Sequence, residues 1–149
     1  MHALSRRERK ETLMLNELYE FAEKQGVTVD CFSLHDTESL SVLYDGECYV
    51  AIDPMLLRSE GDEAVKLAHE LGHCVCGAFY NRYTPLEVAG KCEKIANRWA
   101  IKRLIPEEVL SRAYREGYKE SWEIAEYLSL PEKFVKMAME FYMSRVEGA

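Results

Sequence analysis

The stretch His69-Glu70-Leu71-Gly72-His73 decides how the fold of this 149-residue chain is interpreted. On an α-helix four residues advance by about 400°, so the two imidazoles leave one face roughly 6 Å apart and can bind a single metal ion. Glu70 points about 100° away from His69 and therefore reaches over the open side of the ion without ligating it. The stretch predicts a helix with two zinc ligands, His69 and His73, and a general base, Glu70. The alternative is two surface histidines on an ordinary helix, with the glutamate between them by chance.

Length and composition indicate one domain over residues 1–149. A chain of this size can bury a core without a structural metal, so bound zinc is expected to be catalytic. No apolar run approaches the ~18 residues of a membrane span, and no apolar segment follows the basic N-terminus as in a secretory signal. We therefore expect a cytoplasmic protein. The net charge of −7 argues against direct nucleic-acid binding as its function.

The five cysteines are irregularly spaced and include no Cys-x-x-Cys pair. An odd number without a regular pattern is more typical of reduced thiols than of a disulfide framework. We expect these thiols to be mostly buried. The five positions are Cys31, Cys48, Cys74, Cys76 and Cys92.

Apolar periodicity predicts helix, small sheet, then helices. Residues 5–24 show helical spacing and are followed by a glycine, residues 27–32 have the composition of a strand, and residues 40–52 form a predicted hairpin that turns at Asp45-Gly46. The metal-site helix should run from a cap at Ser59 to about Cys76, and a second long helix from 86 to 104. Further helices are expected within residues 107–146. The predicted class is α+β: a small three-stranded antiparallel sheet packed beside a mainly helical body.

A catalytic zinc usually has three protein ligands and one open position, so a third donor is needed. Glu93 is the best candidate, because it lies 20 residues after His73 on the second long helix, which can cross the first beneath the ion. Asn97, one turn further on, could accept the free N–H of a ligand histidine. Gly72 is unfavourable in a helix, which indicates that the crossing helix packs against its backbone. The alternative is that Glu93 and Asn97 are a solvated pair.

Other donors fit less well. Cys76 starts ~10 Å from His69 along the helix axis, too far to bind the same ion, and Cys74 points ~200° away from Cys76, so the two cysteines cannot chelate an ion together. Glu87 lies about 240° from Glu93 around its helix. The two remaining histidines, His2 and His35, are isolated in the sequence.

The motif His69-Glu70-Leu71-Gly72-His73, followed by Glu93-x-x-Ala96-Asn97-x-Trp99-Ala100 and Leu104-Ile105-Pro106, resembles the ImmA/IrrE family of zinc metallopeptidases. It is also similar to gluzincin-like enzymes, in which the residue matching Glu93 is the third ligand. The resemblance implies a zincin-like active-site helix with a crossing helix, a zinc cofactor, and cleavage of a partner helix-turn-helix repressor, a function associated with phages and mobile elements. An N-terminal DNA-binding domain, present in some relatives, is not seen, which favours a separately encoded repressor as substrate.

The C-terminal segment has an alternative interpretation, because residues 122–141 have the outline of a helix-turn-helix. From residue 107 onward, however, nine Glu outnumber six Lys plus Arg. A DNA reader is normally basic, so we expect this segment to pack against the fold or to dock a partner. The competing function is a non-catalytic module that binds a transcription factor or DNA, and the intact Glu70 argues against it.

Two further features concern the substrate. Tyr80 and Tyr83, after the motif helix, are candidate hydrogen-bond donors to the transition-state oxyanion. An exposed strand beside the metal helix could pair with an extended substrate, and we expect Cys48 to Ile52 to form that edge.

Overall fold

The computed structural model describes residues 3–147 and has the predicted α+β class. The predicted helices and the hairpin at Asp45-Gly46 are present, with bounds within a few residues of those expected. The elements in chain order are α1 (Arg6–Lys24), β1 (Thr28–Cys31), β2 (Ser39–Tyr44), β3 (Glu47–Ile52), α2 (Glu60–Cys76), α3 (Leu86–Leu104), α4 (Glu107–Arg115), α5 (Ser121–Leu128) and α6 (Glu132–Glu147).

The sheet is mixed, so the prediction of an antiparallel sheet is wrong for one of its strands. Its strand order is β1-β3-β2, with β2 antiparallel to β3 and β1 parallel to it. The tight turn fixes β2 and β3 as neighbours. The connection over residues 32–38 leaves one strand position free between β1 and β2, and β3 occupies that position. β3 contains the most buried residues of the sheet, Val50, Ala51 and Ile52, which explains its central place.

The prediction that Cys48 to Ile52 forms an exposed edge is therefore wrong. Val50 has Val29 as its partner on one side and Ser41 on the other, so both sides of β3 are paired. Among the described residues β2 pairs only with β3, which leaves the outer side of β2 as a free edge.

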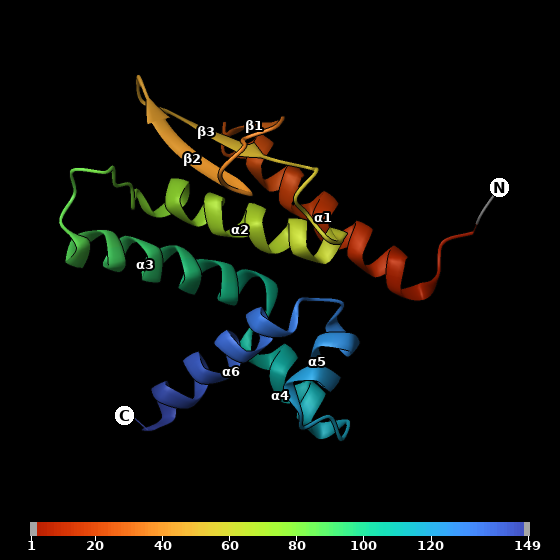
Figure 1. Cartoon of the computed structure of the whole chain (residues 1–149). Coiled ribbons are helices and arrows are strands. Elements are labelled where there is room, and N and C mark those ends of the chain that lie inside the picture. Colours follow the sequence, from red (N-terminus) through yellow and green to blue (C-terminus); the bar gives the residue numbers. More distant parts are fainter. Residues whose placement is uncertain (1–2, 148–149) are drawn as a thin grey trace.

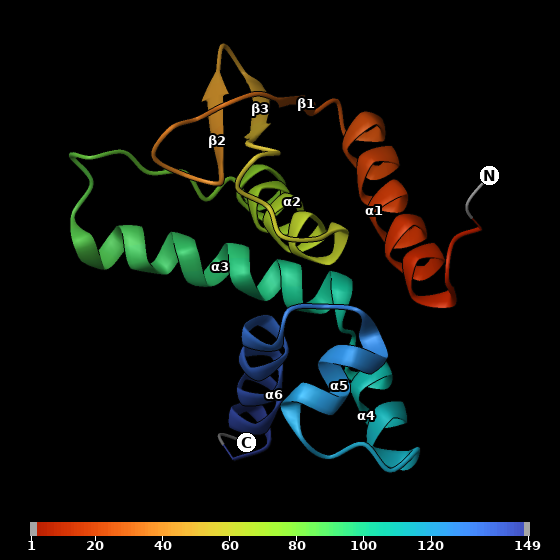
Figure 2. The ribbon, with the colours of Figure 1, turned by 45° about the vertical axis from the view of Figure 1, so that its right-hand side comes forward.

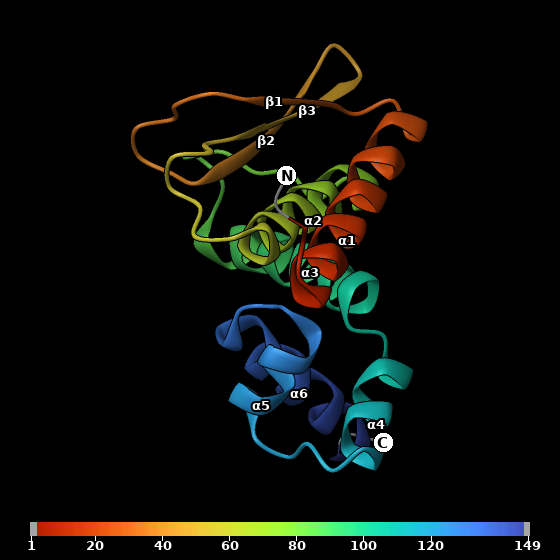
Figure 3. The ribbon, with the colours of Figure 1, turned by 90° about the vertical axis from the view of Figure 1, so that its right-hand side faces the viewer.

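The fold is layered, with α2 in the middle (Figure 1). The sheet covers one side of α2, α1 lies beside it, and α3 crosses on the side away from the sheet. Figures 2 and 3 show α4, α5 and α6 as a group beyond α3. Because α2 is covered on several sides, its apolar residues Ala64, Leu67, Ala68 and Leu71 are fully buried.

Gly72 allows the close approach of α2 and α3, as predicted. A Cβ added at this position would lie 2.8 Å from the carbonyl oxygen of Ala96 and 3.0 Å from its Cα. Both contacts are with backbone, so no side chain could rotate away. Ala96 and Ala100 are also buried, with exposed fractions of 0% and 1%, and their small side chains allow the two helices to pack closely.

The C-terminal helices pack into the hydrophobic core, as predicted. α5 contributes Ile124 and Leu128, and α6 contributes Phe134, Val135 and Ala138. The hydroxyl of Tyr142 also donates a hydrogen bond of 2.8 Å to the carbonyl of Ile105, which links α6 to the end of α3. The face of α6 that carries these residues is therefore occupied by the protein itself.

The cysteines differ from the expectation of reduced, mostly buried thiols. Cys48 on β3 and Cys74 on α2 form a disulfide that joins the central strand to the helix of the motif. Of the others, Cys31 and Cys76 are exposed and only Cys92 is buried. The bond joins residues 26 positions apart that meet only through the packing of the sheet on α2, so their spacing could not reveal it.

Within residues 3–147, no helix combines the length and apolar character needed to cross a membrane.

Candidate active site

The motif lies in the middle of α2. This helix begins at Ser59, whose hydroxyl accepts the N–H of Asp62, and ends at Gly77, whose φ of 64° lies in the left-handed region that glycine favours. Asp62 does not return the bond to Ser59 as a capping box would; its carboxylate accepts the N–H of Arg58 instead. Because both ends are fixed, the two histidines have a defined orientation toward α3.

The structure brings His69, His73 and Glu93 together. The Nε2 atoms of the two histidines lie 3.2 Å apart, and the carboxylate oxygens of Glu93 lie 2.9 Å from His69 and 3.1 Å from His73. One ligand atom from each residue falls within 4.8 Å of the others, the only such group of metal-capable side chains found among residues 3–147. The His73 side chain is 6% exposed and the Glu93 side chain 39%, so the group is closed on one side and open on the other.

The outer nitrogens of both imidazoles are held. His69 Nδ1 lies 2.8 Å from Asn97 Oδ1, and His73 Nδ1 contacts the carbonyl oxygen of Ala78. A carbonyl oxygen only accepts, so Nδ1 of His73 carries a proton, and in the neutral imidazole that a metal requires the lone pair would lie on Nε2. The same tautomer follows for His69. The role of Ala78 could not be predicted from the sequence, because a backbone acceptor in a turn has no residue-type signature.

This set of donor atoms fits a zinc ion. With both histidines neutral, two imidazole lone pairs and the Glu93 carboxylate would converge on one point, where a cation would offset their mutual repulsion. Two histidines and one glutamate are a ligand set that catalytic zinc uses, with a fourth position left open.

Glu93 is ionised in this setting. Burial on its own would raise its pKa, but the hydrogen bond from Tyr80 and the neighbouring His69 and His73 outweigh burial and lower it. The Tyr80 hydroxyl donates to Glu93 Oε1 at 2.7 Å. That bond raises the pKa of Tyr80 to about 12, with burial as a smaller cause, so the phenol keeps its proton at neutral pH.

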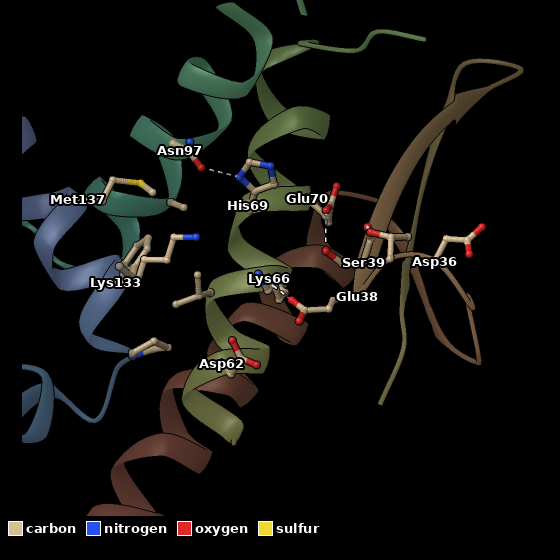
Figure 4. Close-up of a pocket in the computed structure, with 15 residues that line it drawn as sticks. Asp36, Glu38, Ser39, Asp62, Lys66, His69, Glu70, Asn97, Lys133 and Met137 are labelled. Carbon is tan, nitrogen blue, oxygen red and sulfur yellow. Dashed lines mark hydrogen bonds and ion pairs between the residues drawn. The ribbon is translucent and has the colours of Figure 1, made fainter. Parts of the chain in front are cut away.

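Glu70 is buried, at 6% exposure, and faces the sheet. Its Oε2 accepts a hydrogen bond of 2.7 Å from the hydroxyl of Ser39, the first residue of β2 (Figure 4). The role of Ser39 could not be predicted from the sequence, because the residue lies 30 positions before the start of the motif and none of its sequence neighbours suggests a role.

Two cavities border Glu70. One, of about 580 Å³, runs along the N-terminal half of α2 and includes His69 and Asn97; α6 supplies part of its wall through Phe134 and Met137 (Figure 4). The other, of about 320 Å³, is lined by β2 together with His73, Tyr80 and Glu93. Both cavities include Thr37, Ser39 and Glu70, so they meet at the carboxylate. The two together form a cleft that passes beside the free edge of β2.

The other candidates lie away from this centre. Tyr83 is 77% exposed and its hydroxyl accepts from Arg82, so of the two candidate tyrosines only Tyr80 lies at the site. Glu87 and Cys76 are exposed, and neither lines the cleft. His35 is exposed on the loop between β1 and β2, and His2 lies outside the described residues.

Two histidines and a carboxylate on crossing helices, with a further carboxylate beside them, define the class of site that metallopeptidases use. The chain belongs to the Peptidase_M78 family, described as the IrrE N-terminal-like domain, whose profile matches residues 22–140. The match includes every residue of the site and agrees with the resemblance to ImmA/IrrE proteins. The chain has no match among the curated proteins.

Proposed function

We propose that this protein is a zinc-dependent endopeptidase. The observation that carries the proposal is the convergence of His69, His73 and Glu93 on one point, with Glu70 lining the same cavity as His73 and Glu93. Membership of a peptidase family supports it independently.

When bound, zinc would polarise the scissile carbonyl and activate a water molecule. Glu70 accepts the proton that the water releases during attack and passes it to the leaving amine, so no covalent enzyme intermediate is needed. Asn97 and Ala78 hold the two imidazoles in the tautomer that leaves Nε2 free. Tyr80 has a protonated phenol beside the ligand group and can donate a hydrogen bond to the developing oxyanion.

We propose that the substrate binds along the free edge of β2. The cleft runs beside it, and an extended peptide placed there could pair with the backbone of β2 while its scissile bond lies near Glu70. Such pairing depends on backbone shape more than on side chains, which suits a segment of the substrate that can become extended.

The substrate that we propose is a separately encoded helix-turn-helix repressor. This part of the proposal depends on the family resemblance, and a gene for such a repressor adjacent to the gene for this protein would support it. To test this, the protein is exchanged into a zinc-containing buffer and incubated with the repressor. Mass spectrometry of the products then identifies the cleaved bond.

The decisive comparison is with Glu70→Gln. The amide is nearly isosteric but cannot act as a base, so the variant should retain one zinc per chain while turnover falls by at least about 100-fold. Unstructured casein serves as a general substrate if the repressor is unknown. Equal turnover in variant and parent would remove Glu70 from the mechanism, and the absence of any cleavage by the zinc-loaded parent would contradict the proposed function.

The second candidate function is a non-catalytic module that binds a transcription factor. A cleft with an open edge strand could hold a peptide without cutting it. This candidate predicts that the parent and Glu70→Gln bind the repressor equally and that neither cleaves it.

A further inference from the structure

Ser39 contacts Glu70 from the opposite side of the cleft. It is the first residue of β2, and its hydroxyl donates to Glu70 Oε2 at 2.7 Å. The contact joins the sheet to the helix of the motif at the point where the two cavities meet. One oxygen of the Glu70 carboxylate is therefore occupied by the sheet, and Oε1 remains for other partners.

The backbone around Ser39 is fixed by several independent contacts. Ser39 pairs with Ile52, which is fully buried, and the carbonyl of the preceding residue, Glu38, accepts the N–H of Asp53 at 2.9 Å. The carboxylate of Glu38 in turn forms an ion pair of 2.8 Å with Lys66 on α2. The start of β2 is thus held to both β3 and α2, so the hydroxyl of Ser39 has a defined position.

A carboxylate at this place in α2 needs such a restraint. Glu70 directly follows His69, and an unrestrained carboxylate could turn toward the cation between the histidines and become a ligand itself. It would then fill the open position and lose its function as a base. A hydrogen bond to a charged group is among the stronger side-chain contacts and can select one rotamer.

From this geometry we propose that Ser39 is a positioning residue for Glu70: it holds Oε2 so that Oε1 faces the substrate and the carboxylate stays off the metal. The inference rests on the proposed function, because the role of Glu70 as a base comes from it. Ser39 itself does not touch the reacting atoms.

The kinetic test uses Ser39→Ala and Ser39→Thr. Loss of the hydroxyl should lower kcat about 10-fold while KM changes by less than about twofold, and the threonine, which keeps a hydroxyl and favours strands, should recover most of the loss. Ser121→Ala is the matched control. It removes another serine-to-glutamate hydrogen bond, 2.8 Å long, between Ser121 and Glu132, away from the cleft, and should leave kcat unchanged.

A double mutant separates positioning from a general effect on β2. If Ser39 acts through the base, Ser39→Ala should have no further effect on the residual turnover of Glu70→Gln. The proposal is wrong if kcat of Ser39→Ala equals that of the parent, or if the alanine lowers turnover equally in both backgrounds.

A crystal structure of zinc-loaded Ser39→Ala gives a readout that does not depend on activity. We expect the Glu70 carboxylate to turn toward the zinc in the variant and to remain apart from it in the parent. A Glu70 carboxylate that keeps its orientation without the serine would overturn the proposal even if the parent turned out to have no peptidase activity. Conversely, an inactive parent in which Glu70 moves as expected would contradict the proposed function alone.

Discussion

Gly72→Ala should lower the free energy of unfolding by about 1–2 kcal/mol, although alanine is the better helix former. The intrinsic preference favours alanine by about 1 kcal/mol. The new Cβ, however, would lie 2.8 Å from the backbone oxygen of Ala96, so α3 would have to move by about half an ångström. Because backbone cannot rotate away, this overpacking should cost about 2–3 kcal/mol, the upper part of the usual range. The backbone contact should outweigh the preference.

The same displacement should weaken zinc binding. Glu93 lies one turn before Ala96, and Asn97 directly follows it, so a shift of α3 moves a ligand and the partner of His69 together. Metal–ligand distances tolerate about 0.2 Å, which is less than the expected shift. We expect the zinc dissociation constant to rise at least about tenfold.

Two glycines provide controls for this prediction. Gly90 is exposed on α3, and a Cβ added there would meet no atom within 4 Å, so Gly90→Ala should be neutral or stabilising by up to about 1 kcal/mol. Gly61→Ala would meet the carbonyl of Ser129 and should destabilise the fold without moving α3 toward or away from the motif. Urea unfolding in the presence of a chelator measures stability, and calorimetric titration measures zinc affinity. If Gly72→Ala matched Gly90→Ala in both measurements, the close packing of α2 on α3 would not determine the site.

Three further predictions concern the ligands and the disulfide. Glu93→Ala should lose zinc along with activity, because two histidines leave the ion under-coordinated; a full equivalent of zinc in the purified variant would place the third ligand elsewhere. Zinc affinity should fall as pH drops below ~6.5, where free imidazole protonates. Glu93 does not cause this loss, because its pKa is lowered and it stays ionised as the histidines protonate. Unchanged zinc content at pH 4.5 would contradict histidine ligation. Reductant should open the Cys48–Cys74 disulfide and lower the free energy of unfolding of the parent by about 3 kcal/mol. It should not change the stability of Cys48→Ser. Equal unfolding midpoints of the parent with and without reductant would show that the two sulfurs are not bonded.

The helices and the hairpin could be predicted because their causes are local. The turn at Asp45-Gly46 needs residues that accept positive φ, and both have it, at 52° and 77°. The close approach at Gly72 could also be predicted, since a glycine inside a buried helix needs a reason and a crossing helix provides one. In each case the sequence within a few residues contains the physical cause.

The strand order and the contacts across the cleft could not be predicted in this way. The composition of residues 27–32 identifies β1 but does not say beside which strand it lies or in which direction it runs. Ser39 and Ala78 act through a hydroxyl and a carbonyl that become significant only when β2 and the turn after α2 are placed against the motif. Tyr80 and Tyr83 are chemically alike, and only the path of the loop distinguishes them.

The most direct test of the metal centre is a crystal structure of the zinc-loaded protein with anomalous scattering measured at the zinc edge. We predict one peak per chain, about 2.0–2.2 Å from Nε2 of His69, Nε2 of His73 and a carboxylate oxygen of Glu93, with the Glu70 carboxylate outside ligand distance. A peak bound by cysteine sulfur, or one that lacks either histidine, would contradict the account.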